Sequence, residues 1–176
     1  MMFPEALTPE HCRALIARFE SAPEHAISRL DAGYSFSQLD ITGQWPDENK
    51  LLVPIFLSHF NRYQLALDAR FWPVKFSFEH VRIKRYMPNG RDQFPLHVDV
   101  VNQAACRRFM TALIYLNAPG GGETVFPTLD ISVAPEPGKL LAFPPLWMFP
   151  HEGLAPRSAA KYILHTYLCY PATPAP

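Results

Sequence analysis

The chain has 176 residues, its 16 lysines and arginines balance its 16 aspartates and glutamates, and 48% of its residues are hydrophobic. This length and composition are typical of one folded domain and not of a disordered protein. The neutral charge argues against nucleic acid as a partner, and no apolar run reaches the roughly 18–20 residues of a membrane span. Three cysteines and the lack of a secretory signal pattern favour a cytoplasmic protein. The oligomeric state is left open.

The first 70 residues are predicted to be mainly helical. Thr8 and Pro9 have the pattern of an N-cap followed by proline in the first helical turn. Residues 33–48 are rich in turn formers and aromatic residues, which favours a loop or a short hairpin. A second helix is expected over Asn49–Arg70. Its apolar stripe comprises Phe56, Phe60, Tyr63 and Leu67.

From Pro73 onward, short segments rich in β-branched and aromatic residues alternate with glycine and proline breaks, which is typical of strands in a barrel or a double sheet. The predicted strands are Lys75–Tyr86, Met110–Leu116, Thr124–Phe126, Ile131–Val133, Lys139–Phe143 and Lys161–Tyr170. We therefore expect a single domain over residues 1–176. It would comprise a helical support layer (1–72), a β core (73–170) and a flexible tail (171–176).

The candidate metal ligands are two histidines and one aspartate. His97 and Asp99 lie two positions apart, so on extended backbone they point to the same side. His151 follows a long apolar, proline-rich run. Two histidines and one carboxylate are the facial set of non-haem Fe(II) oxygenases. By itself each residue also fits an ordinary surface or structural role.

The last predicted strand places Lys161, His165 and Tyr167 on one face. A lysine on an inward face needs an anion or contact with solvent, although a lysine at the end of a strand in water is equally ordinary. Thr111 and Tyr115 share a face of the strand over residues 110–116, where two hydroxyl groups could meet a polar ligand. The β-propensity of threonine and tyrosine is the alternative explanation.

Residues 76–170 contain, in this order, the motifs HVD, RFMTALIYLN, GGGETVFP, PEPGKLLAF and HEG, followed by a lysine. This series resembles the prolyl 4-hydroxylase branch of the Fe(II)/2-oxoglutarate-dependent dioxygenases. The resemblance implies a mainly β fold with supporting helices, in which a double-stranded β-helix (jelly-roll) core is flanked by N-terminal helices. It also implies Fe(II), 2-oxoglutarate and dioxygen as cofactors, with ascorbate as an optional stimulant.

Carried over by position, the resemblance assigns His97, Asp99 and His151 to the catalytic metal centre. Lys161 matches the basic residue that pairs with the distal carboxylate of 2-oxoglutarate. The other positions implied to bind the cosubstrate are Tyr86, Thr111, Tyr115, Thr124, His165 and Tyr167. Candidates for contact with the substrate are Arg107 and Arg108 beside the cleft, and Trp45 and Arg91 in the loops 33–48 and 87–95 expected at its rim.

The chain departs from the family pattern at two positions, with histidine at 165 where threonine is usual and tyrosine at 167 where tryptophan is common. His165 could reshape the cosubstrate pocket or donate a hydrogen bond near the iron. It could equally be a core histidine bonded to the backbone.

The resemblance implies a hydroxylase that acts on an unactivated C–H bond, and a prolyl residue in a peptide or protein is the first expected substrate. The alternatives are a free amino acid or a small natural-product intermediate and, in another functional class, a non-catalytic cupin-like metal-binding module. The partner is therefore expected to be a peptide or a small-molecule substrate, with no nucleic acid and no membrane involved.

Overall fold

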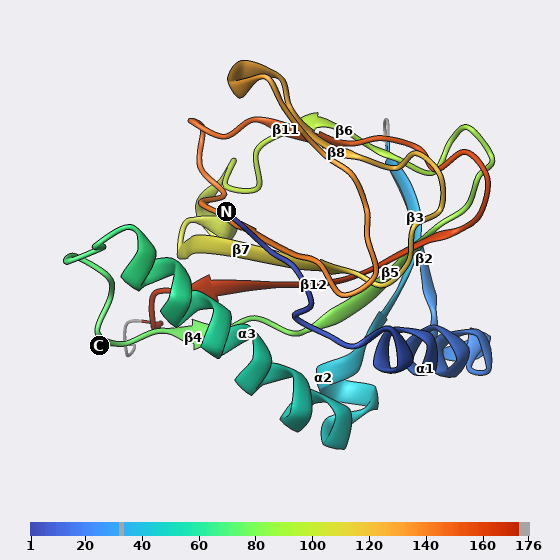
Figure 1. The fold of residues 1–176 in the computed structure, drawn as a ribbon, viewed down its shortest axis with the longest axis horizontal. Helices are drawn as coiled ribbons and strands as arrows, with labels where there is room; N and C mark the ends of the chain where they lie inside the picture. Colours follow the sequence, from blue (N-terminus) through green and yellow to red (C-terminus); the bar gives the residue numbers. More distant parts are fainter. Residues whose placement is uncertain (32–33, 173–176) are drawn as a thin grey trace.

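The computed structural model describes residues 1–31 and 34–172. Its backbone forms two antiparallel sheets that face each other, and helices cover the outer face of the larger sheet (Figure 1). This is the mainly β, jelly-roll architecture with N-terminal helices that the sequence predicts. Of the predicted tail, residues 173–176 lie outside the described residues.

The large sheet has eight strands, and the central strand β12 pairs with β7 on one side and with β4 and β5 on the other. In spatial order the sheet comprises β1 (Met2–Phe3), β10 (Leu140–Phe143), β7 (Arg108–Tyr115), β12 (Lys161–Cys169), β5 (Arg82–Tyr86), β3 (Tyr34–Asp40) and β2 (Ile27–Asp31), with β4 (Ser77–Phe78) also on β12. The small sheet comprises β6 (Phe94–His97), β11 (His151–Gly153), β8 (Thr124–Phe126) and β9 (Ile131–Val133).

Three helices pack on the large sheet or connect to it: α1 (Pro9–Glu20), α2 (Ile41–Gln44) and α3 (Pro46–Ala66). Short 3₁₀ turns lie at Pro23–His25, Gln103–Ala105 and Pro127–Leu129. The predicted cap of α1 is confirmed, because the Thr8 hydroxyl accepts a hydrogen bond from the backbone N–H of His11 at 3.2 Å. Among the described residues, none of the helices combines the length and apolar character needed to cross a membrane.

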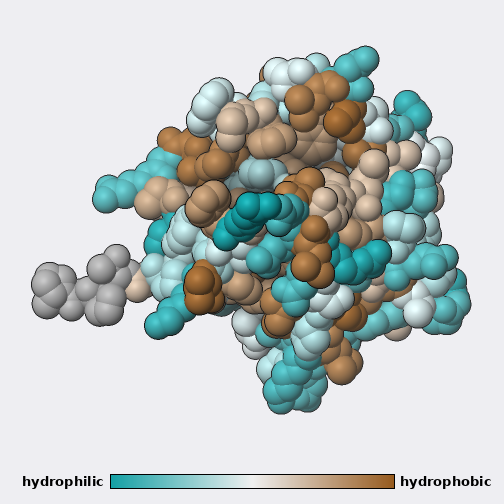
Figure 2. Space-filling model, turned by 60° about the vertical axis from the view of Figure 1, so that its left-hand side comes forward, coloured by the Kyte–Doolittle hydropathy of each residue, from teal (hydrophilic) through white to brown (hydrophobic). Residues whose placement is uncertain are grey.

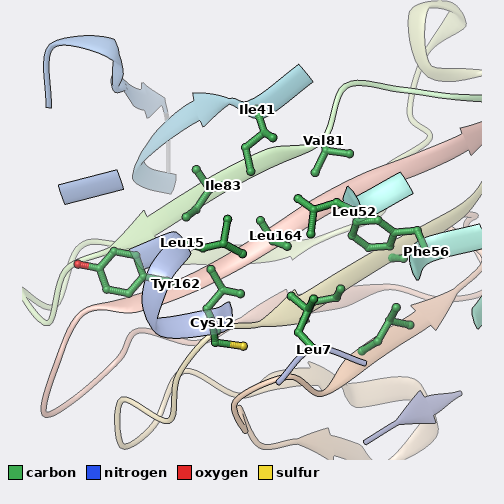
Figure 3. Close-up of a cluster of buried hydrophobic side chains, with 14 of the residues drawn as sticks. Leu7, Cys12, Leu15, Ile41, Leu52, Phe56, Val81, Ile83, Tyr162 and Leu164 are labelled. Carbon is green, nitrogen blue, oxygen red and sulfur yellow. The ribbon is translucent and has the colours of Figure 1, made fainter. Parts of the chain in front are cut away.

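Side chains of β12 point alternately to the two faces of the large sheet, and each face belongs to a different hydrophobic core. Tyr162 and Leu164 point toward the helices, where Leu15 of α1 and Leu52 and Phe56 of α3 meet them (Figure 3). The intervening residues point toward the small sheet, and Ile163 belongs to the second core between the sheets. Successive residues of a strand face opposite sides, so one strand contributes both to the hydrophobic support and to the lining of the space between the sheets.

The fold differs from the predicted elements in its first third. Strands β2 and β3 form a hairpin and extend the large sheet, so a mainly helical segment is wrong there. The loop or hairpin expected at 33–48 is placed too late, because residues 41–44 and the start of α3 are helical. The second helix ends at Ala66, and Leu67 is exposed beyond it. Exposed apolar groups are interspersed with hydrophilic ones on the face shown in Figure 2, which is normal for a protein surface.

Gly138 is expected to tolerate no side chain. Its φ is +79°, its carbonyl accepts a hydrogen bond from Ala6 N–H at 2.8 Å, and a Cβ would lie 2.0 Å from the Leu7 carbonyl oxygen. Gly138→Ala should lower the free energy of unfolding by more than about 2 kcal/mol, because both the backbone conformation and the contact are strained. Gly90→Ala is the matched control, since Gly90 has a φ of +71° but no atom within 4 Å. Equal losses in denaturant unfolding would contradict the argument.

Candidate active site

The three predicted metal ligands converge on one point. His97 ends β6 and His151 begins β11, and the two residues are direct partners in the small sheet. Asp99 follows β6 and lies between them, with its Oδ1 3.6 Å from His97 Nε2 and its Oδ2 3.8 Å from His151 Nε2. All three ligand atoms lie within 4.8 Å of one another. The sheet therefore assembles the facial set that the spacing of these residues predicts.

Backbone carbonyls orient both imidazole rings. His97 Nδ1 lies 2.8 Å from the Pro95 carbonyl oxygen, and His151 Nδ1 lies 3.1 Å from that of Phe149. Each Nδ1–H can therefore donate to its carbonyl, which leaves the Nε2 lone pair facing the shared point. Hydrogen bonds of this kind fix the tautomer of metal-binding histidines.

Asp99 has one oxygen that is held and one that has no partner. Tyr167 OH donates to Asp99 Oδ1 at 2.7 Å, whereas buried Oδ2 accepts no hydrogen bond from any residue that the structure describes. Burial alone would raise the pKa of this carboxyl, but His97, His151 and other donors outweigh it and hold the pKa well below its usual range. A buried, ionised and partly unpaired carboxylate beside two imidazole nitrogens fits a divalent cation such as Fe(II).

Tyr167→Phe should weaken the binding of Fe(II) by about 10- to 100-fold, the usual cost of losing a hydrogen bond to a ligating group. The phenylalanine keeps the ring but removes the hydroxyl that orients Asp99 Oδ1. Anaerobic titration with Fe(II) measures this affinity. Tyr170→Phe is the control, because Tyr170 is half-exposed and its described contacts are a ring contact with Phe109 and backbone hydrogen bonds. Equal affinities in the two variants would remove Tyr167 from this role.

A first cavity of about 70 Å³ adjoins the triad. It is lined by the side chains of the metal centre together with several predicted cosubstrate residues. The predicted residues in its wall are Tyr86, Thr111, Thr124, Lys161 and His165. Strands β5, β7, β8 and β12 supply them, so both sheets contribute to this cavity.

Lys161 is a buried cation at the wall of the first cavity. Its side chain is 3% exposed and its Nζ lies 5.4 Å from the ring centre of Tyr86. It forms no hydrogen bond or ion pair with any residue that the structure describes. Burial lowers the pKa of its ammonium group to about 8, against the attraction of Glu123. Such a group is stabilised when an anion joins it, and the distal carboxylate of a dicarboxylic acid would do so.

The glycine turn before β8 makes room for this lysine. Gly122 has a φ of +77°, and a Cβ on it would lie 2.9 Å from Lys161 Cδ. A Cβ on Gly153 would lie 3.9 Å from Lys161 Nζ. Only glycine combines this backbone conformation with this contact at position 122. The sequence motif GGGET therefore shapes the lysine pocket.

The two predicted tyrosines on β7 and β12 lie outside the wall of the first cavity. Tyr115 is fully buried and its hydroxyl donates to Thr124 Oγ1 at 2.7 Å, so it lies behind the cavity and holds Thr124. Tyr167 contacts the metal carboxylate instead. The resemblance implies that both tyrosines bind the cosubstrate directly. In the structure each tyrosine instead contacts a residue of the cavity wall, Thr124 or Asp99.

His165 lies between two cavities. Its Nε2 is 3.1 Å from Thr111 Oγ1, and its buried Nδ1 has no partner among the described residues. Burial, with Lys84 adding to it, lowers the pKa of His165 well below the usual value, so the ring is neutral at pH 7. Of the roles left open by the sequence, a core histidine bonded to the backbone is wrong, because its ring partner is the Thr111 side chain.

A second cavity, of about 290 Å³, meets the first at Lys84, Phe94 and His165. Arg108 lies in its wall as expected for a residue at the cleft, with its Nε 2.6 Å from Glu79 Oε1 and its guanidinium 4.0 Å from the ring centre of Tyr167. The remaining wall residues are Arg29, Phe36, Gln38, Arg82 and Tyr167.

Three predicted substrate residues line neither cavity. Trp45 is a core residue, 5% exposed, with the Arg18 guanidinium 4.4 Å from its ring centre. Arg107 is exposed and donates to the Tyr170 carbonyl, and Arg91 is exposed as well. The helical start of α3 carries position 45 into the core, which explains why the expected rim loop is absent there.

Two residues of β5 line the second cavity but were not predicted from the sequence as site residues. Arg82 and Lys84 precede Tyr86 at intervals of two and face the same side. Because Tyr86 was assigned to the site, period-two alternation would have identified both.

Comparisons with known proteins agree with this geometry. A model of the 2OG-Fe(II) oxygenase superfamily matches residues 81–169, a range that contains the triad and Lys161. No curated protein sequence matches the chain.

Several solved structures share the fold. A Pseudomonas putida prolyl-4-hydroxylase is 21% identical, with a TM-score of 0.74 over 98% of this chain and 92% of its own. A viral collagen prolyl hydroxylase from Paramecium Bursaria Chlorella virus-1 is 21% identical, with a TM-score of 0.70 over 98% and 96%. A Trichoplax adhaerens prolyl hydroxylase in complex with a hypoxia inducible factor oxygen degradation domain peptide fragment is 16% identical, with a TM-score of 0.77 over 96% and 82%.

The matched range covers half of the chain and contains the complete donor set for iron together with the buried lysine. The family uses Fe(II) and 2-oxoglutarate. Asp99 Oδ2, which has no hydrogen-bond partner among the described residues, and the buried Lys161 ammonium fit these two groups. The chain therefore belongs to the 2OG-Fe(II) oxygenase superfamily.

Proposed function

We propose that this oxygenase hydroxylates a C–H bond of a prolyl residue in a peptide or protein. The observation that carries the proposal is the meeting of two cavities beside the metal triad. The smaller one is lined by buried Lys161, which has no hydrogen-bond or ion-pair partner among the described residues, and the larger one shares only Lys84, Phe94 and His165 with it. This arrangement offers separate places for the cosubstrate and for the substrate.

In this proposal His97, Asp99 and His151 hold Fe(II), and Lys161 pairs with the distal carboxylate of 2-oxoglutarate. Thr111 and Thr124 offer hydroxyl groups to the cosubstrate from the facing sheets. When bound, the iron and 2-oxoglutarate supply the oxidative chemistry that inserts an oxygen atom from dioxygen into the C–H bond. The protein orients the reactants and excludes water from the space between the sheets.

A peptide is favoured as the substrate by the place of the second cavity in the fold. Its wall includes Arg29 on β2, the edge strand of the large sheet, and Phe36 and Gln38 on β3. A chain longer than one residue could therefore extend past the hairpin. The similar fold of three prolyl hydroxylases, one of them bound to a peptide, supports the same choice.

The second candidate is a free amino acid or a small natural-product intermediate. The volume of the second cavity, about 290 Å³, favours it, because small-molecule sites begin near this size, at roughly 300 Å³. The structure disfavours a non-catalytic metal-binding module, because such a module needs no buried lysine in the cavity beside its metal site.

Product analysis tests the proposal. Protein supplied with Fe(II), 2-oxoglutarate and dioxygen is incubated with prolyl peptides or with free amino acids, and mass spectrometry follows the added oxygen atom while succinate is measured in parallel. Hydroxylated peptide with equimolar succinate supports the first candidate. Hydroxylation of free amino acids alone would support the second candidate, and succinate formed without any hydroxylated product would contradict both.

A further inference from the structure

The second cavity is lined by four cationic side chains: Arg29, Arg82, Lys84 and Arg108. None of its wall residues that the structure describes is acidic. A concentration of one charge in a cavity selects the opposite charge in a ligand. The cavity is therefore built for an anion, provided that the protein does not already neutralise these groups.

Only part of this positive charge is neutralised by described residues. Glu79 accepts two hydrogen bonds from Arg108, at 2.6 and 3.0 Å. Its Oε2 also lies 4.0 Å from Arg82 Nη1. Asp40 lies opposite Arg82 in the sheet, but its Oδ2 is 2.6 Å from His80 Nδ1. One carboxylate is thus divided between two guanidinium groups.

Lys84 has no carboxylate of its own. It forms no hydrogen bond or ion pair with any residue that the structure describes, and its Nζ lies 4.9 Å from the ring centre of Phe36 and 5.8 Å from that of Phe94. Burial lowers the pKa of this ammonium group to about 8, partly offset by Asp99. A carboxylate that binds beside this ammonium group would form a charge-assisted hydrogen bond and compensate for the hydration lost on burial.

This cluster is separate from the lysine assigned to 2-oxoglutarate. Lys161 Nζ lies over the rings of Tyr86 and Tyr115, whereas Lys84 Nζ lies over those of Phe36 and Phe94. Arg82 lines the second cavity and not the first. Lys84 lines both cavities, so Arg82 is the residue that distinguishes the anion of the second cavity from the cosubstrate.

We propose that the substrate carries a carboxylate close to the hydroxylated carbon, and that Arg82 and Lys84 bind this carboxylate and determine specificity. The inference rests on the proposed hydroxylase function. The carboxylate can come from an aspartate or glutamate beside the target residue of a peptide, or from the α-carboxylate of a free amino acid. The two sources share the same recognition chemistry and are separated by experiment.

The experiment compares acidic substrates with neutral isosteres. Prolyl peptides with Asp or Glu beside proline are paired with their Asn or Gln counterparts, and free proline is paired with prolinamide. The ratio of kcat/KM for each pair, from the hydroxylated product, should favour the carboxylate by about 10- to 100-fold, the usual value of a hydrogen bond to a charged group. Whether the peptide pair or the free amino acid pair gives this ratio identifies the source of the carboxylate.

Arg82→Gln should reduce this ratio by about tenfold or more through KM, because the variant removes a charge from the second cavity alone. Arg91→Gln is the matched control, an exposed arginine outside both cavities, and should preserve the ratio. Isothermal titration of the same peptides into protein loaded with Mn(II) and 2-oxoglutarate gives a second readout that needs no turnover.

The outcomes separate the two proposals. Equal kcat/KM for acidic and neutral partners overturns the carboxylate preference but leaves hydroxylation standing. Preferential binding of the acidic peptides without any hydroxylated product supports the anionic site and contradicts the hydroxylase proposal. A ratio that changes equally in Arg82→Gln and Arg91→Gln would contradict the role of Arg82.

Discussion

His97→Ala is expected to abolish the binding of Fe(II) and with it the consumption of 2-oxoglutarate. The variant removes one of three donors that meet within 4.8 Å, and the loss should exceed the roughly 100-fold that follows from removing a mere hydrogen-bond partner of a ligand. Anaerobic titration with Fe(II) and then 2-oxoglutarate measures it, through the weak visible metal-to-ligand charge-transfer band. The band should appear in the wild type and be absent in the variant.

A matched variant shows that the effect is local. His25 lies in a 3₁₀ turn remote from the cavities and its side chain is 47% exposed, so His25→Ala should retain the band. The thermal unfolding of both variants is followed as well. A folded His97→Ala protein with an undiminished band would remove His97 from the metal centre.

Lys161→Met should raise the concentration of 2-oxoglutarate that half-saturates the band by about 100-fold or more, as expected when one partner of a buried charge pair is lost. Methionine has a similar length and no charge. Because the lysine is buried without a described counter-ion, its removal should leave the melting temperature unchanged or raise it. A variant with weaker affinity for 2-oxoglutarate and an unchanged melting temperature would show that Lys161 binds the cosubstrate and does not merely support the fold.

The pH dependence gives an independent test of the same residue. An anion binds the protonated ammonium, and burial has lowered the pKa of Lys161 to about 8. Affinity of the wild type for 2-oxoglutarate should therefore be full below pH 8 and fall as the pH rises above it. Lys139→Met, which removes a lysine that pairs with Glu136 away from the cavities, should keep this dependence. A wild-type affinity that stays constant up to pH 10 would contradict the assignment.

Most of the β core could be predicted from the sequence because its strands are bounded by glycine and proline. The strands at 124–126 and 131–133 were predicted with the bounds that the structure has. The hairpin of β2 and β3 was expected too late in the chain, since its strands lie in a segment interrupted by turn formers and Leu30 is 84% exposed. Strands β6 and β11 are only three or four residues long and carry proline, histidine or glycine, so they have almost no strand signal of their own.

The candidate site was predictable where several motifs occur in a fixed order along the chain. The HxD pair and Lys161 each have ordinary alternatives when taken alone, and the order and spacing of the surrounding motifs indicated their place in the site. Arginines are common on surfaces, so Arg108 could not be separated from Arg107 until Glu79 was seen to hold one of them in the cavity wall. Trp45 was misplaced because its environment depends on where α3 begins, and helix starts are poorly encoded when the cap makes no side-chain hydrogen bond.

The central strand β12 has a consequence for how such a protein can diverge. All of its residues are buried, and neighbours bond it on both sides, so an inserted residue would turn Lys161 or Tyr167 to the wrong face. The spacing of Lys161, His165 and Tyr167 along β12 is therefore expected to stay fixed as the sequence diverges. The edge strand β2 is bonded on one side only and supplies Arg29 to the second cavity, so descendants of this chain can change this part of the cavity wall without disturbing β12.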